Sequence, residues 1–176
     1  MNSNSICFIV VVYEFSIELL LTLESIALED PLASIFIKSA EPISQENCVE
    51  IRKYGGNIVI QCSYDSGIYD AWNQSLDNEF VLSHNFITFF GAGDLLNRGA
   101  CREYDASIRG LSFDVLTSKS VDTFQDGRCI TNGMAMNRGR FQKYFCINHS
   151  GVLYKTEWIK SRKFDTSFKS SGDYCF

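Results

Sequence analysis

The chain contains the run Phe86-Ile87-Thr88-Phe89-Phe90, which stops at Gly91-Ala92-Gly93-Asp94. A short aromatic and β-branched run bounded by glycines predicts a strand that is buried on both faces, as interior strands of a parallel sheet are. Asp94 follows the carboxyl end of that strand, and this edge of an open α/β sheet is where phosphorylated ligands and their metals bind. The stretch therefore predicts an α/β fold with one carboxylate at its ligand-binding edge.

The first half of the chain alternates between strand and helix patterns. Apolar and β-branched residues predict strands over residues 6–13, 34–37 and 58–61. Between them, capping residues and apolar spacing predict helices from Ser16 to Asp30 and over residues 45–54, and a third helix follows the third strand. This alternation implies right-handed crossovers and a mostly parallel, Rossmann-like central sheet flanked by helices.

The second half of the chain lacks this regular alternation of strands and helices. It predicts a helix around residues 95–108, strands over residues 111–116, 121–124 and 151–155, and a loop over residues 131–144. The sequence Gln125-Asp126-Gly127-Arg128 is typical of a hairpin turn. We expect these strands to form a small antiparallel addition to the sheet.

Length, charge and cysteine spacing limit the classes of protein to which this chain can belong. A chain of 176 residues with 45% hydrophobic residues fits one folded domain over residues 1–176. The net charge of −5 and the lack of a lysine or arginine cluster exclude a nucleic-acid footprint. The seven cysteines include no Cys-x-x-Cys pair, which favours free thiols in a reducing compartment over a zinc site. No basic residue precedes Lys38, so the apolar start is not a secretory signal, and we expect a cytoplasmic protein, with peripheral contact at the inner face of the membrane left open.

Three motifs along the chain share one resemblance. They are Asp65-Ser66-Gly67-Ile68-Tyr69-Asp70-Ala71-Trp72-Asn73, the strand that ends at Asp94, and a C-terminal set made of Asn148-His149-Ser150-Gly151, Phe164-Asp165-Thr166-Ser167-Phe168 and Gly172-Asp173-Tyr174. In this order and spacing they resemble the bacterial family 2 glycosyltransferases over residues 6–174. The resemblance implies a GT-A fold and inverting sugar transfer from a nucleotide-diphosphate sugar to a saccharide or lipid-linked saccharide acceptor, in surface polysaccharide biosynthesis.

The resemblance also implies roles for particular residues on the donor side. Asp94 would hold Mg²⁺ or Mn²⁺ on the donor diphosphate, whereas taken alone an aspartate after a glycine is more typical of a helix cap. Residues of the donor pocket would be Asp65, Gly67, Asp70, Asn73 and Gly93. The alternative for the residues of the 65–73 segment is a capped helix over buried aromatic side chains.

On the acceptor side, the resemblance makes Asp173 the general base that takes the proton from the acceptor hydroxyl. The alternative for Asp173 is an N-terminal helix residue without a partner. His149 is placed on the acceptor side, although a histidine in such a position more often makes a structural hydrogen bond. His84 carries no signal.

The chain departs from the family pattern at two places. Lys38 stands where the family has an aspartate that grips the nucleoside, and a lysine, which has no acceptor, is expected to pair with phosphate instead. The chain stops at Phe176, so we expect a donor-binding half over residues 1–96 and an incomplete acceptor half over residues 97–176, completed by a homo-oligomer or a partner subunit. These departures favour the alternative of a non-catalytic protein of the same fold that binds a partner enzyme or a sugar nucleotide. A nicotinamide-dependent enzyme lacks its Gly-x-Gly-x-x-Gly signature here.

Overall fold

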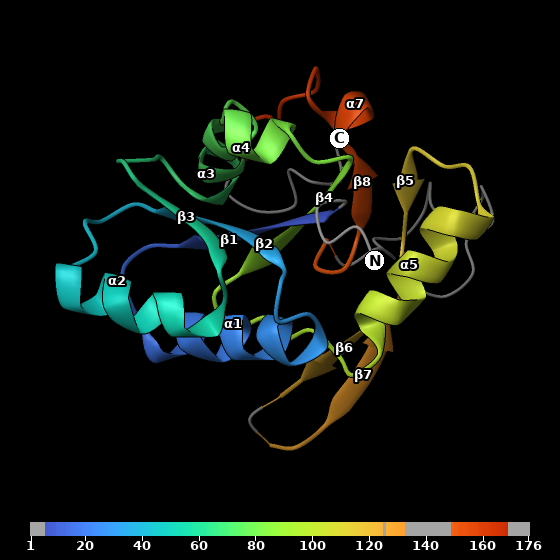
Figure 1. The fold of residues 1–176 in the computed structure, drawn as a ribbon, viewed down its shortest axis with the longest axis horizontal. Coiled ribbons are helices and arrows are strands. Elements are labelled where there is room, and N and C mark those ends of the chain that lie inside the picture. The colour runs from blue at the N-terminus through green and yellow to red at the C-terminus, as the bar shows by residue number, and fades with distance from the viewer. Residues whose placement is uncertain (1–5, 125, 133–148, 169–176) are drawn as a thin grey trace.

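The computed structural model describes residues 6–124, 126–132 and 149–168, and its centre is a six-stranded sheet (Figure 1). The strand order is β3-β2-β1-β4-β8-β5. Four strands are mutually parallel, namely β1 (Ile6–Val12), β2 (Ser34–Ser39), β3 (Asn57–Cys62) and β4 (Phe86–Gly91). The fifth, β8 (Leu153–Lys155), runs antiparallel to both β4 and β5 (Val115–Leu116). The predicted mostly parallel sheet is confirmed.

Helices cover both faces of the sheet. One layer contains α3 (Ile68–Ser75), α4 (Glu79–Leu82) and α7 (Thr156–Ile159). The helices on the other side are α1 (Ile17–Glu29), α2 (Gln45–Ile51) with the 3₁₀ turn η1 (Arg52–Tyr54), and α5 (Ala100–Gly110). Figure 1 shows α3, α4 and α7 above the sheet and α1 below it.

Alternation along β1 explains how one strand supports two cores. Cys7, Ile9 and Val11 pack with the α3 side, while Phe8 and Val10 pack with α1. Successive side chains of a strand point to opposite faces, so a strand buried on both faces must be apolar at every position. This requirement is the reason that the continuous apolar runs in the sequence predicted the central strands correctly.

Several boundaries in the second half differ from the prediction. The helix expected around residue 95 begins at Ala100, and only residues 115–116 of the expected strand 111–116 are extended in the sheet. The hairpin is confirmed as β6 (Ser120–Thr123) and β7 (Cys129–Asn132), but it forms a separate two-stranded sheet. Thr131 and Asn132 therefore belong to a strand and not to the expected loop, whose remaining residues lie outside the described ranges. Within the described ranges, no helix is long and apolar enough to cross a bilayer.

Candidate active site

Asp94 closes a tight turn at the carboxyl end of β4. Its Oδ2 accepts hydrogen bonds from the Gly91 N–H at 2.8 Å and from the Ser150 hydroxyl at 2.7 Å. From the described part of the chain, no hydrogen bond reaches the other carboxylate oxygen, Oδ1. The helix that follows starts at Ala100 with Gly99 in the cap position, so the alternative of Asp94 as a helix cap is wrong.

The loop from Gly93 to Gly99 is fastened to α1. The N–H groups of Gly93 and Leu96 donate to the hydroxyls of Thr22 and Ser25, each at 2.9 Å, and the Gly99 N–H donates to the Glu29 carboxylate at 2.7 Å. Gly93 has a φ of 100°, a left-handed conformation that favours glycine. These hydrogen bonds fix the backbone beside Asp94 and so restrict where its carboxylate can lie.

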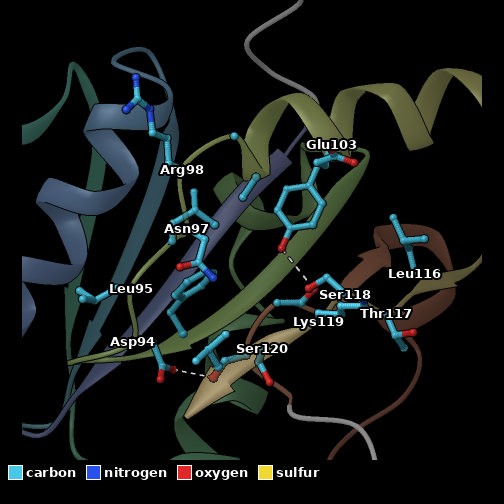
Figure 2. A pocket seen from close by; sticks show the side chains of 18 of the residues that line it. Asp94, Leu95, Asn97, Arg98, Glu103, Leu116, Thr117, Ser118, Lys119 and Ser120 are labelled. Carbon is cyan, nitrogen blue, oxygen red and sulfur yellow. Dashed lines mark hydrogen bonds between the residues drawn. The ribbon is translucent and has the colours of Figure 1, made fainter. Parts of the chain in front are cut away.

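A cavity of about 940 Å³ opens beside Asp94. It is bounded by the 93–99 loop, the first half of α5, residues 116–123 and the Ser150-Gly151 pair. Figure 2 shows residues 94–98 on one side of it and residues 116–119 on the other. Its wall includes seven residues with a side-chain hydroxyl, namely Tyr104, Ser107, Thr117, Ser118, Ser120, Thr123 and Ser150. A wall of this kind offers both donors and acceptors to a polyhydroxylated ligand.

Lys38 lies at the carboxyl end of β2 and is completely buried. Its ammonium donates to the Asp65 carboxylate at 2.7 Å, to the Ser63 carbonyl at 2.6 Å and to the Ser39 carbonyl at 3.3 Å. An ammonium has three protons, and all three are used by these acceptors. The expectation that Lys38 pairs with phosphate is therefore wrong for this structure, because the ammonium forms an ion pair with Asp65.

The predicted donor residues around α3 have well-defined local roles. The Gly67 N–H donates to Asp65 at 3.2 Å, and the φ of 132° at Gly67 turns the chain into α3. Asp70 accepts from the N–H and the hydroxyl of Ser66 at 2.8 and 3.1 Å. The Ser66 N–H lowers the pKa of Asp70, and the Ser66 hydroxyl and the Gln74 amide act in the same direction. A carboxylate held in this way stays ionised.

Asn73 ties α3 to the segment after α7. Its amide accepts from the Phe164 N–H at 2.8 Å and donates to the Phe164 carbonyl at 2.9 Å. The structure thus gives Asn73 a structural contact, and its predicted donor role stays untested.

His149 lies in the aromatic core and not on an open surface. Its ring stacks on Trp72 with centroids 4.4 Å apart, and its Nδ1 lies 3.1 Å from the Tyr154 hydroxyl. Burial lowers the pKa of His149 from its usual 6.5 to about 3, so the imidazole is neutral at physiological pH. The structure thus gives His149 a structural contact, and its predicted place on the acceptor side stays untested. Asp173, the predicted base, lies outside the described residues.

The structure brings Gly93 and Asp94 to the cavity, whereas Asp65, Gly67 and Asp70 do not line it. Asp65 follows β3 and pairs with Lys38 of β2. In the sheet, β3 and β4 are three strand spacings apart, which corresponds to roughly 14 Å. No cluster of three or more metal-ligating side chains exists among the described residues. No sequence pattern predicted a role for Ser150, although it belongs to the motif Asn148-His149-Ser150-Gly151.

Comparisons with solved structures support the fold. Residues 1–349 of S. aureus TarS, a GT-A-like glycosyltransferase, superpose with a TM-score of 0.71 at 17% identity, covering 98% of this chain and 53% of that one. The same protein in complex with UDP-GlcNAc gives 0.70 at 17% identity over 97% and 51%. An Anaerococcus prevotii 4-diphosphocytidyl-2C-methyl-D-erythritol synthase gives 0.56 at 11% identity over 97% and 82%.

The chain thus has a GT-A-like fold, the glycosyltransferase-like mixed α/β architecture. It spans about half the length of the TarS 1–349 chain that it matches. No protein-family model and no curated protein matches the sequence.

Proposed function

We propose that the protein is a metal-dependent inverting glycosyltransferase, which moves a sugar from a nucleotide-diphosphate sugar to a saccharide or lipid-linked saccharide in surface polysaccharide biosynthesis. The observation that carries the proposal is Asp94, placed at the end of β4 beside a hydroxyl-lined cavity with one oxygen anchored and the other without a donor from the described residues. The neighbour with UDP-GlcNAc bound supports a nucleotide-sugar donor.

The residues present fit a divalent cation. Mg²⁺ is usually bound by one or two carboxylates while phosphates and water fill its other positions, so the Oδ1 of Asp94 suffices as a protein ligand. When bound, such a cation offsets the charge that develops on the leaving diphosphate. Asp94 would hold it at the edge of the sheet, where the fixed loop backbone keeps the carboxylate in place.

The donor would lie across the carboxyl ends of the parallel strands. Its diphosphate would meet Asp94 beyond β4, and its nucleoside would extend across β1 toward Asp65, which pairs with Lys38 of β2. The sugar would enter the cavity, whose size of about 940 Å³ lies in the range of ligand sites. The hydroxyl of Ser118 would contact the sugar there.

Asp173 would act as the base. It would take the proton of the acceptor hydroxyl while the acceptor oxygen bonds to the anomeric carbon and the nucleoside diphosphate leaves with the electron pair of the broken bond. The motif Gly172-Asp173-Tyr174 supports this role by resemblance alone.

Release of nucleoside diphosphate from a panel of nucleotide sugars tests the proposal. With Mn²⁺ present, we expect release from at least one donor, and we expect Asp94→Ala and EDTA each to abolish it. Glu24→Ala, which removes an exposed carboxylate from α1, is the matched control and should release at the wild-type rate. Donor binding that persists in EDTA and ignores Asp94→Ala would contradict the proposal.

That contrary result would favour the second candidate, a non-catalytic protein of the same fold that binds a partner enzyme or a sugar nucleotide. The ion pair between Lys38 and Asp65 supports this candidate, because it occupies the place where the family has a free nucleoside-binding carboxylate. Calorimetric titration with the same donor panel separates binding from turnover.

A further inference from the structure

Three consecutive residues, His149 to Gly151, bring the second half of the chain to the carboxylate of the first half. They lead into β8, which pairs with β4, so Ser150 lies beside Asp94 although 56 residues separate them. The hydroxyl of Ser150 donates to Asp94 Oδ2 at 2.7 Å. Hydrogen bonds to an ionised carboxylate are among the stronger ones in proteins.

The backbone on both sides of Ser150 is fixed by separate contacts. On one side, His149 is stacked in the aromatic core against Trp72. On the other, the Gly151 carbonyl accepts from the Ser118 hydroxyl at 2.8 Å and from the Tyr104 hydroxyl at 3.2 Å. Because its two neighbours are held, the Ser150 hydroxyl is oriented before any ligand arrives.

The two hydrogen bonds to Oδ2 determine the orientation of the Asp94 carboxylate. The Gly91 N–H alone would leave the Asp94 carboxylate able to rotate about its χ2 bond, which is a soft torsion. The Ser150 hydroxyl, arriving from a different element, removes that freedom and leaves Oδ1 as the oxygen that can take a ligand. Groups that hold a metal ligand in this way typically change metal affinity by 10- to 100-fold.

We propose that Ser150 is a positioning residue, whose hydroxyl fixes the Asp94 carboxylate so that Oδ1 faces a divalent cation. The inference rests on the proposed function, since it needs Asp94 to bind a metal. It adds that the metal site is built jointly by the β4 turn and by the segment that enters β8.

The affinity of the protein for Mn²⁺ in the presence of saturating UDP tests the inference. Free Mn²⁺ is counted by electron paramagnetic resonance for the wild type, Ser150→Ala, Ser150→Thr and Asp94→Ala. We expect Ser150→Ala to weaken Mn²⁺ binding by about 10- to 100-fold and Ser150→Thr, which keeps the hydroxyl, to restore most of it. Ser112→Ala, an exposed serine away from the cavity, is the control and should bind Mn²⁺ as the wild type does.

The unfolding midpoint without metal separates positioning from simple stabilisation. A positioning role predicts that Ser150→Ala loses Mn²⁺ affinity while its metal-free midpoint stays within a few degrees of the wild type. Wild-type affinity in Ser150→Ala together with lost affinity in Asp94→Ala would overturn this inference alone. Wild-type affinity in Asp94→Ala would overturn the proposed metal site and this inference with it.

Discussion

His149 shows how burial turns a titratable side chain into a structural one. The ring is stacked against Trp72 and Phe89, and among the described residues only its Nδ1 meets a polar partner, the Tyr154 hydroxyl. Because the charged imidazolium would lose its hydration there, the pKa of His149 falls to about 3. These contacts hold the residue that precedes Ser150, and the predicted place of His149 on the acceptor side stays untested.

This lowered pKa predicts a specific pH dependence of stability. Below pH 6.5 the unfolded chain protonates His149, whereas the folded chain resists until about pH 3, so the unfolded state binds more protons and stability falls as pH falls. We expect the wild type to lose about 3 kcal/mol more than His149→Phe between pH 7 and pH 4. Urea unfolding of both proteins across this range measures the difference. Parallel stability curves would contradict the buried, neutral state of His149.

Lys38 shows that a residue can be noticed in the sequence and still be misjudged. The sequence marks it as a departure from the family pattern, but its partner Asp65 lies 27 residues further on and was assigned to the donor. The pairing depends on β2 and β3 lying side by side, with Ser39 opposite Cys62. Only the tertiary fold shows that the charge of Lys38 is compensated by Asp65.

Among the elements, the turn before β8 depends on a glycine. Gly151 has a φ of 93°, and a Cβ at this position would lie 2.6 Å from the Ser118 hydroxyl oxygen. We expect Gly151→Ala to lower the free energy of unfolding by about 2 kcal/mol, from the left-handed backbone and the contact together. Adding Ser118→Ala should relieve the contact but not the backbone strain. Chemical denaturation of the two single variants and the double variant measures this coupling.

We expect the double variant to be more stable than the sum of the two single effects predicts. Ser118→Ala removes the hydroxyl oxygen that the new Cβ at position 151 would contact too closely. Additive effects would show that the Ser118 side chain moves away freely. The Ser118 hydroxyl would then have little part in fixing the cavity wall.

Elements with strong local signals were predictable, and short elements were not. β1 and β4 contain long apolar runs, and β2 contains the shorter run Ile35-Phe36-Ile37, as expected for strands covered on both faces. Asp126-Gly127 marks the hairpin turn by local turn chemistry. α4 and α7 have four residues each, too few for a helical period to be recognised. β8 is an exception, because its three residues lie within the strand that the sequence predicts over residues 151–155, although its pairing with β4 was not predicted.

At the scale of the whole molecule, the site depends on one sheet that contains strands from both halves of the chain. β8 lies between β4 and β5, so the second half contributes its strands directly beside the strand that presents Asp94. Position at the end of β4 made Asp94 predictable from the sequence. The cavity was not predictable, because its wall comes from α5, the hairpin and the β8 entrance, which only the assembled fold brings together.

The β6–β7 hairpin lies outside the central sheet. Among the described strands, β6 and β7 pair only with each other, and Val121 and Ile130 are 47% and 49% exposed. An isolated two-stranded sheet is marginally stable in water, so we expect its amides to exchange hydrogen faster than those of β1, β2 and β4. Residues 117–123 line the cavity, and a ligand bound there would therefore restrain β6.

Hydrogen exchange followed by mass spectrometry, with and without a nucleotide sugar that the protein binds and Mn²⁺, tests this placement. We expect peptides that cover the 93–99 loop and β6 to exchange several-fold more slowly with the donor, while α4, which leads into the amino end of β4, stays unchanged. Asp94→Ala should lose the protection, because the diphosphate would no longer be held at the cavity. Protection that appears in α4 but not in β6 would show that the donor binds away from the cavity.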